Sequence, residues 1–242
     1  MCTLSIIVTA PGEFTLGFNR DEKPGREEGA PAVRGDRRRY IAPIDLATGG
    51  TWIAVGASGL AFALLNRSEP RVPGAEAGLS RGRIVPAVAE CADLASIARE
   101  LAALAPAVAR GFRLIATDGE AVLEAIGSGG AVAVSVEPLR RPYLRASSGL
   151  GDHLVQPPRG ELFEACVVAA ASDAAALPAA QQAFHGHRWN DRRHLSVLMD
   201  RGEARTVSRT FVRVDRARVE LTHALRTGDG FAAATTHELE RT

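Results

Sequence analysis

The chain has 242 residues, 46% of them hydrophobic and 24% charged, and a chain of this length and composition can bury a core of its own. Its 29 basic and 28 acidic residues leave a net charge of +1, which argues against a nucleic-acid partner. The apolar stretches end well short of the roughly 20 residues of a membrane span, so we expect no integral membrane segment.

Two hairpins are predicted in the first third of the chain. β-Branched residues flank the turn Pro11-Gly12, which predicts paired strands over 3–9 and 14–18. A second pair of strands is predicted over 51–55 and 60–65. The segment between the hairpins, 23–48, is rich in Pro, Gly and Arg and is expected to be a loop.

Helical and extended patterns alternate in the rest of the chain. Helices are predicted over 84–90, 94–104, 161–171 and 173–184, and strands over 112–117, 121–126, 131–136, 195–199, 204–214 and 219–225. Strands joined by tight hairpins pair antiparallel, and helices that come in pairs between blocks of strands indicate an α+β layered fold. Without repeats or a linker, one domain over 1–242 is the simplest organisation.

The three cysteines, Cys2, Cys91 and Cys166, are odd in number and widely spaced. Such spacing in a chain this large does not indicate a disulfide framework, and it fits a reducing compartment. No leader sequence is evident, because Pro11-Gly12 interrupts the first apolar run. We therefore expect a cytoplasmic protein in which Cys91 and Cys166 are core residues of alanine-rich helices.

Cys2 is the candidate nucleophile. Removal of Met1 is expected because Cys2 is small, and it would leave a thiol and a free α-amino group on one residue. An α-amino group titrates near ~7.7 to 8, so a useful fraction is neutral at neutral pH and can accept the thiol proton. No catalytic histidine is then required.

The first hairpin brings Asn19, Arg20, Asp21 and Glu22 close to Cys2. A two-residue turn places Asp21 opposite Cys2, and a three-residue turn places Glu22 there with Arg20 diagonal on the same face. Arg20 would lower the pKa of the thiol, and Asp21 would accept a hydrogen bond from the α-ammonium group. A solvated strand end with a surface ion pair is the alternative.

Two residues of the second hairpin complete this candidate site. Asn66 ends the hairpin, and its side-chain amide can donate to the oxyanion formed on an attacked carbonyl. Trp52 begins the hairpin and is expected either to line a pocket or to pack in the core.

These residues, in this order, resemble the NRDE family, also called the transport and Golgi organisation protein 2 family. That family is similar to the N-terminal-nucleophile hydrolases of the choloylglycine hydrolase and penicillin V acylase group. The resemblance implies a four-layer αββα sandwich of two antiparallel sheets between helical layers. It rests on Met1-Cys2-Thr3-Leu4, Asn19-Arg20-Asp21-Glu22, Gly49-Gly50-Thr51-Trp52, Gly59, Asn66 and Ser80-Arg81-Gly82, with weaker matches at Gly111 to Leu114 and Arg193 to Val197.

The resemblance also implies roles for individual residues. Its catalytic set is the nucleophile Cys2, the orienting residues Arg20 and Asp21, the oxyanion donor Asn66 and the late arginine Arg193. The substrate-binding positions expected beside this set are Asn19, Glu22, Trp52 and Ser148. Ser148 lies in Ala146-Ser147-Ser148-Gly149, where such hydrolases have an asparagine. A polar contact to the substrate is therefore altered, and low or narrow activity is expected.

Other clusters of polar residues suggest different chemistry. The histidines and Asp191 of the segment 185–194 are residue types that bind metals, but on an irregular polar loop they are more often solvated, so we expect neither a metal nor a cofactor. A papain-like pair of Cys2 with His185 or His194 stays open. The run Arg37 to Arg39 is expected to be solvated, with binding of a substrate carboxylate or phosphate as the alternative.

Two functions agree with these features. The first is a hydrolase that acts on a small-molecule amide or thioester through an acyl-enzyme on Cys2. The alternative is a binding or transfer protein that holds an acyl-CoA, a lipid or a haem-like ligand without turnover. The sequence leaves the substrate and the oligomeric state open.

Overall fold

The computed structural model describes residues 2–67, 79–104, 111–128 and 130–242, and within them two seven-stranded sheets. In the first sheet the strand order is β10-β1-β2-β11-β12-β13, with β14 also pairing with β12. Its strands are β1 (Cys2–Ala10), β2 (Glu13–Glu22), β10 (Tyr143–Ser147), β11 (Arg205–Val214), β12 (Arg218–Thr227), β13 (Gly230–Phe231) and β14 (Thr235–Glu240).

The second sheet is a meander in chain order, from β3 to β9. Its strands are β3 (Glu28–Arg34), β4 (Tyr40–Asp45), β5 (Ile53–Gly56), β6 (Ala61–Asn66), β7 (Phe112–Thr117), β8 (Ala121–Ser128) and β9 (Ala131–Pro138). All strand pairs in both sheets are antiparallel.

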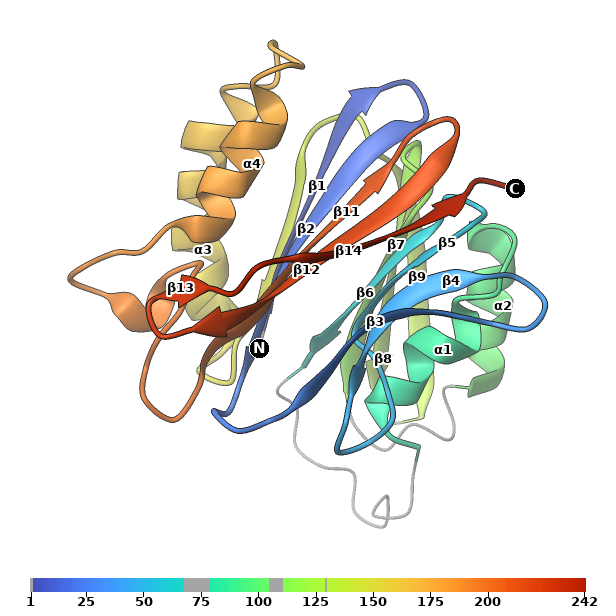
Figure 1. Ribbon diagram of the computed structural model, residues 1–242, viewed down its shortest axis with the longest axis horizontal. Helices are drawn as coiled ribbons and strands as arrows, with labels where there is room; N and C mark the ends of the chain where they lie inside the picture. Colours follow the sequence, from blue (N-terminus) through green and yellow to red (C-terminus); the bar gives the residue numbers. More distant parts are fainter. Residues whose placement is uncertain (1, 68–78, 105–110, 129) are drawn as a thin grey trace.

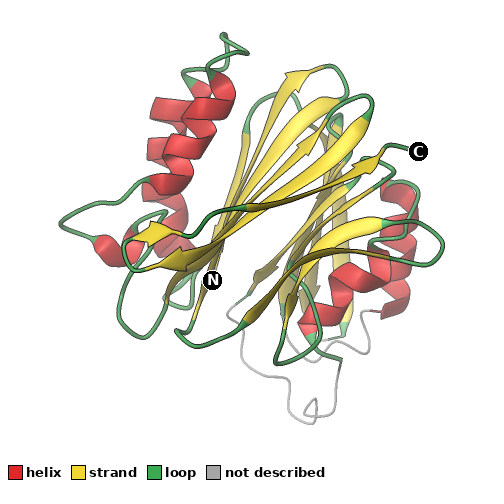
Figure 2. Ribbon diagram, viewed as in Figure 1, coloured by secondary structure: helices red, strands yellow, loops and turns green. Residues whose placement is uncertain are grey.

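Helices cover the outer face of each sheet, which completes four layers (Figures 1 and 2). The helices α3 and α4 lie on the first sheet, and α1 and α2 lie on the second. Their bounds are α1 (Ile84–Val88), α2 (Leu94–Leu104), α3 (Asp152–Phe163), which a π-helical turn over Glu164–Val168 continues, and α4 (Leu177–Gly186). The expected αββα arrangement is confirmed. None of the helices in the described part of the chain has the length and apolar character of a membrane span.

Strand alternation explains how one sheet can serve two apolar layers. In β1, Leu4 and Ile6 point into the core between the sheets, whereas Ile7 points toward α3 and α4. A third apolar cluster lies between the second sheet and its helices. Each residue of β1 and β2 is therefore assigned by its position to one of two faces, and this assignment determines which side chains can meet Cys2.

Most of the predicted elements are present, but the predicted loop 23–48 contains β3 and β4. Prolines inside both strands hid them from sequence reasoning. Pro31 lies at a register shift of the edge strand β3, between Gly29 and Ala32, where a missing N–H is tolerated. Pro43 lies beyond the part of β4 that pairs with β5, which involves only Tyr40 and Ile41.

Two other predictions need correction. The helix expected from residue 161 begins at Asp152. Its first part was missed because α3 includes Pro157 and Pro158, and prolines usually interrupt a helix. The strand expected over 195–199 is a 3₁₀ turn followed by irregular chain. Side chains satisfy its carbonyls there, since Asn19 donates to Val197 O and Arg159 to Ser196 O. The strands β10, β13 and β14 were not predicted.

Candidate active site

Cys2 begins β1, an inner strand that pairs with β10 on one side and β2 on the other. It lies directly opposite Arg20 of β2 and Ser147 of β10. The register differs by one or two residues from the two that were predicted, because it shifts between Val8 and Ala10 near the hairpin turn. A residue is thereby added on the β1 side, and Arg20 becomes the direct partner of Cys2.

The thiol of Cys2 is buried in the core between the sheets, with Trp52 and Leu65 in the same apolar cluster. Burial raises the pKa of the thiol, whereas a hydrogen bond from the backbone N–H of Asp21 and the charge of Arg20 act to lower it. The net direction is upward. The charge of Arg20 acts on the thiol pKa in the expected direction, but the loss of hydration outweighs it.

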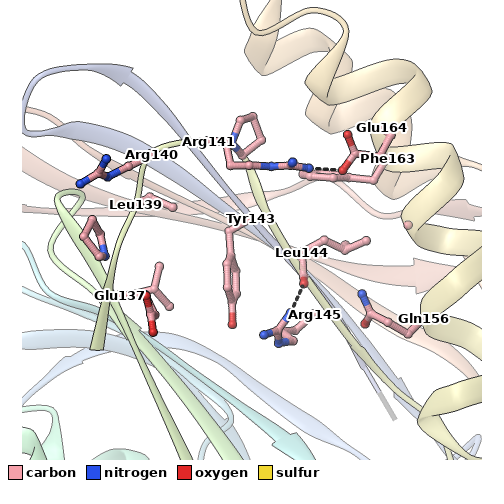
Figure 3. Close-up of a pocket in the computed structure, with 14 residues that line it drawn as sticks. Glu137, Leu139, Arg140, Arg141, Tyr143, Leu144, Arg145, Gln156, Phe163 and Glu164 are labelled. Atoms are coloured by element: carbon pink, nitrogen blue, oxygen red, sulfur yellow. Dashed lines mark hydrogen bonds and ion pairs between the residues drawn. The ribbon is translucent and has the colours of Figure 1, made fainter. Parts of the chain in front are cut away.

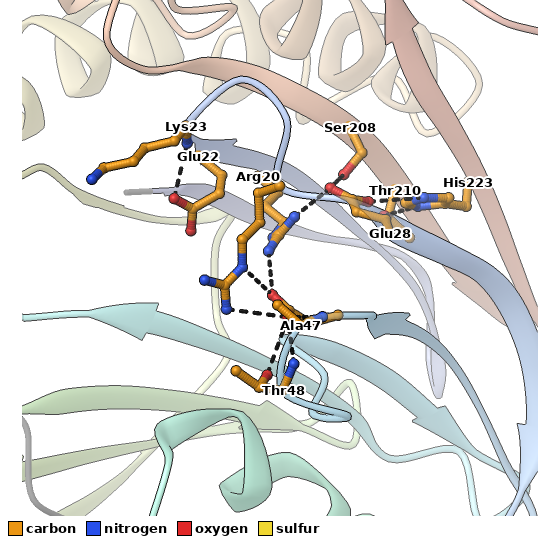
Figure 4. A network of polar contacts seen from close by, with 11 residues as sticks. Arg20, Glu22, Lys23, Glu28, Ala47, Thr48, Ser208, Thr210 and His223 are labelled. Atoms are coloured by element: carbon orange, nitrogen blue, oxygen red, sulfur yellow. Dashed lines mark hydrogen bonds and ion pairs between the residues drawn. The ribbon is translucent and has the colours of Figure 1, made fainter.

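Arg20 connects the two sheets (Figure 4). Its Nη1 donates to Oε1 of Glu28 at 2.6 Å, and its Nη2 donates to Oδ2 of Asp45 at 2.8 Å. Its Cζ atom lies 4.1 Å from the centroid of the Trp52 ring, a cation–π contact. Two carboxylates and an aromatic face thus hold the guanidinium in place.

The two carboxylates that bind Arg20 have further partners of their own. Ser208 donates to Glu28 at 3.0 Å, and His223 Nε2 lies 3.2 Å from Glu28 Oε2. Arg26 donates to Asp45 at 2.8 Å. Although burial opposes ionisation of both carboxyl groups, contacts from His223 and Arg20 hold the pKa of Glu28 below its usual value, and contacts from Arg26 and Arg20 do so for Asp45. Both acids were missed because they lie in the predicted loop.

Asp21 faces the helical layer rather than the core between the sheets. The hydroxyl of Thr206 donates to its Oδ1 at 2.6 Å, and Nη2 of Arg159 lies 4.0 Å from its Oδ2. Burial raises the pKa of Asp21, and the charge of Arg159 acts to lower it. Asp21 still reaches Cys2 through the hydrogen bond from its backbone to the thiol.

Arg159 of α3 is a buried cation that sequence reasoning missed. It is 1% exposed, and Nη1 donates to the hydroxyl of Thr3 at 2.6 Å. Nε and Nη2 donate to the carbonyls of Leu195 and Ser196. The signal for Arg159 in the sequence would be an arginine inside a helical segment, but the two prolines before it concealed that helix. Arg159 holds the start of β1 against α3, beside Asp21.

Asn19 lies on the helical face of β2, opposite to the face that carries Cys2. Its Nδ2 donates to the carbonyls of His185 and Val197, both at 2.9 Å, and its Oδ1 lies 3.0 Å from His185 Nδ1. Its amide therefore anchors the end of α4 and the following chain to the first sheet, away from the space that a substrate at Cys2 would occupy.

The register also decides the orientation of Asn66. Asn66 is the last residue of β6 and pairs with Phe112, whose ring belongs to the cluster beneath α1 and α2. Leu65 points instead into the core that contains Cys2. Because direct partners share a face, the register places the Asn66 side chain on the helical side of the second sheet, away from the thiol.

The remaining predicted residues are distributed around this core. Glu22 is half-buried at the end of β2 and accepts a hydrogen bond from the Lys23 N–H. Ser148 is buried just beyond β10; its N–H donates to Asp152, and its hydroxyl accepts from the Leu150 N–H. Arg193 is exposed on a 3₁₀ turn.

A cavity of about 480 Å³ lies beside β10 and α3 (Figure 3). Tyr143 and Arg145 belong to its wall. The Tyr143 hydroxyl donates to Oε2 of Glu124 in β8 at 3.1 Å, and Nη2 of Arg145 donates to the same oxygen at 2.9 Å. Glu124 also pairs with Arg113 at 2.7 Å. Ser147 follows Arg145 by two residues on the same face of β10, so one strand connects this cavity with the position opposite Cys2.

The structure places the histidines of the segment 185–194 in different surroundings. In the described ranges, no group of three or more His, Cys, Asp or Glu residues is placed to hold a metal. His185 is fully buried, and its Nε2 lies 2.8 Å from the hydroxyl of Ser5. Because Ser5 and Cys2 point to opposite faces of β1, His185 cannot form the papain-like pair. His194 is exposed.

The arrangement of sheets and helices is shared with known hydrolase structures. The penicillin V acylase from Agrobacterium tumefaciens superposes with a TM-score of 0.59 and 12% identity, covering 91% of this chain and 82% of that one. A mutant of the conjugated bile acid hydrolase from Clostridium perfringens gives a TM-score of 0.52 and 9% identity, covering 100% and 98%. The fold is therefore that of the N-terminal-nucleophile hydrolases.

The family is defined by sequence. The model of the family described as Transport and Golgi organisation 2 matches residues 1–156, and the chain belongs to this family. The match includes Cys2, the first two strands and the segment that contains Ser147 and Ser148. None of the curated proteins matches the chain significantly.

Proposed function

We propose that the protein is a hydrolase of a small-molecule amide or thioester, with Cys2 as its nucleophile once Met1 has been removed. The observation that carries the proposal is the position of Cys2. A thiol begins an inner strand, lies opposite Arg20 and Ser147, and accepts a hydrogen bond from the Asp21 backbone. The names of the structural neighbours, an acylase and a conjugated bile acid hydrolase, agree with acyl chemistry.

Two groups of Cys2 carry out the reaction: the thiol is the nucleophile, and the α-amino group transfers the proton. The α-amino group of Cys2 accepts the thiol proton, and the thiolate adds to the substrate carbonyl. The amino group then returns the proton to the leaving amine or thiol, and an acyl group remains on sulfur. Water, deprotonated by the same amino group, releases the acid. Asp21 is one residue from Arg20 on β2 and supplies the carboxylate that holds the α-ammonium form.

The proposal includes the cytoplasm as the location, because a reducing compartment keeps unpaired cysteines free. The described cysteines are all free. We propose no metal and no cofactor for this reaction, because the thiol and amino group of Cys2 supply the nucleophile and the base.

A non-catalytic carrier of an acyl-CoA, lipid or haem-like ligand is the second candidate. The burial that raises the pKa of Cys2 favours it, since a protonated thiol is a poor nucleophile. In the carrier, Cys2 would be a core residue, and its replacement by Ser would leave ligand affinity unchanged.

Mass spectrometry of the intact protein separates the two functions. The purified protein is incubated with 4-nitrophenyl acetate, and both its starting mass and any added acetyl group are recorded. A hydrolase lacks Met1, acquires one acetyl group on Cys2 and releases nitrophenolate repeatedly, and Cys2→Ala abolishes all labelling at that position. A retained Met1, or equal turnover by Cys2→Ala, contradicts the proposal. Binding of palmitoyl-CoA and haemin by both forms without turnover supports the carrier.

A further inference from the structure

Ser147 has an unusual position next to Cys2. It is the last residue of β10 and the direct antiparallel partner of Cys2 on the side away from Arg20. Direct partners in such a pair have Cβ atoms about 4.5–5.5 Å apart and point to the same face. The hydroxyl of Ser147 therefore lies beside the thiol, on the face of the sheet that looks into the core between the sheets.

The hydroxyl of Ser147 is buried and has no hydrogen-bond partner in the described part of the chain. The neighbouring residues are satisfied, because the Ala146 N–H donates to Gln156 and the Ser148 N–H donates to Asp152. A serine hydroxyl can donate one hydrogen bond and accept two. Leaving it unpaired in a buried site is unfavourable, and a ligand that reaches Cys2 would supply the missing partner.

The other polar groups considered for this role are committed elsewhere. The terminal nitrogens of Arg20 donate to Glu28 and Asp45. The register places the side chain of Asn66 on the far face of the second sheet, with Phe112. Ser147 is thus a side-chain donor that β10 holds next to the thiol.

We propose that Ser147 is a catalytic residue that donates its hydroxyl hydrogen to the carbonyl oxygen of the substrate and stabilises the oxyanion. This inference rests on the proposed function. The sulfur of Cys2 bonds to the carbonyl carbon, and the π electron pair moves to oxygen. Ser147 keeps its proton throughout. When the tetrahedral intermediate collapses, the electron pair re-forms the carbonyl, the bond to the leaving group breaks, and the leaving group takes the proton from the α-ammonium group.

The test compares two reactions of the same thiol. Acetylation of Cys2 by 4-nitrophenyl acetate develops an oxyanion, whereas alkylation by iodoacetamide is a displacement at saturated carbon and develops none. Both rates are measured at the peptide that carries Cys2. We expect Ser147→Ala to slow acetylation about a hundredfold, as is typical for loss of one oxyanion donor, and to leave alkylation unchanged.

Two further measurements separate chemistry from structure. Because the Ser147 hydroxyl has no partner among the described residues, Ser147→Ala should keep or raise the melting temperature, and Ser147→Thr should restore much of the acetylation rate. The matched control is Ser135→Ala, which removes a hydroxyl from the exposed strand β9 and should alter neither rate.

The outcomes distinguish failure of this inference from failure of the proposed function on which it rests. Equal acetylation rates in wild type and Ser147→Ala overturn the role of Ser147 while leaving Cys2 as nucleophile. A parallel fall of acetylation and alkylation also overturns it, because the variant would then have displaced the thiol. Absence of acetylation in the wild-type protein overturns both the hydrolase and the role of Ser147.

Discussion

Acid should destabilise this protein through His185, a buried residue that is not part of the proposed chemistry. Nε2 of His185 in α4 lies 2.8 Å from the Ser5 hydroxyl, and its Nδ1 lies 3.0 Å from Oδ1 of Asn19. These contacts join the helical layer to β1 and β2. Burial, together with the positive charges of Arg209 and Arg159, lowers the pKa of His185 from 6.5 to about 3. The native protein therefore keeps this imidazole neutral in a range where the unfolded chain protonates it.

The direction and size of the effect follow from proton linkage. Below pH 6.5 the unfolded state binds one more proton than the native state, so the free energy of unfolding falls as the pH falls toward about 3. The contribution of His185 is fully present above pH 6.5. A difference of one proton corresponds to about 1.4 kcal/mol per pH unit, so we expect a loss of about 2 kcal/mol between pH 6.5 and pH 5.

Urea unfolding followed by circular dichroism at several pH values measures this slope. His185→Gln retains an amide in place of the ring but cannot titrate, so its free energy of unfolding should depend less on pH by about 1.4 kcal/mol per unit. The matched control is His194→Gln, which removes an exposed histidine and should keep the wild-type slope. If His185→Gln and wild type have the same slope between pH 6.5 and pH 5, the reasoning is refuted.

Three further substitutions test the network around the site. Arg20→Met should lower the free energy of unfolding by about 3–5 kcal/mol, because it leaves two carboxylates without their shared cation; a change below 1 kcal/mol in urea unfolding would contradict this. Arg159→Met should raise the pKa of Asp21 further and move the acid limb of the acetylation profile to higher pH, and an unmoved limb counts against a role for the Asp21 carboxylate. Gly127→Ala should cost about 1–3 kcal/mol, since a Cβ there overlaps the Phe112 ring, and a melting temperature equal to wild type would show that the ring can move aside.

The order of elements in the first third of the chain was predictable because local signals agree there. Alternating apolar residues and the turn at Pro11-Gly12 define β1 and β2. The helix α2 has the predicted bounds, and Asp93 caps it by accepting from the Ser96 N–H at 2.7 Å. The motif that begins at Asn19 also brought Arg20 and Asp21 close to Cys2. Such features depend on neighbours in the sequence, and a single sequence contains them.

What was missed depends on contacts that no short sequence pattern specifies. The register shift near Ala10 decides that Arg20 faces Cys2, and no local pattern indicates it. Arg159 reaches Asp21 only because α3 folds back over the first sheet. Ser147 was read as part of a departure from the family pattern, and its importance became visible only when β10 paired with β1.

The extra residue between Val8 and Ala10 makes the length of the first hairpin a functional constraint. Neighbouring side chains on a strand point to opposite faces, so a one-residue insertion or deletion in this turn would direct Arg20 toward the helices and bring an adjacent residue opposite the thiol. Substitutions in the turn should be tolerated far better than changes in its length. The spacing between Cys2 and Arg20 is thus a criterion for judging which homologous genes encode an intact site, even where the turn sequences have diverged completely.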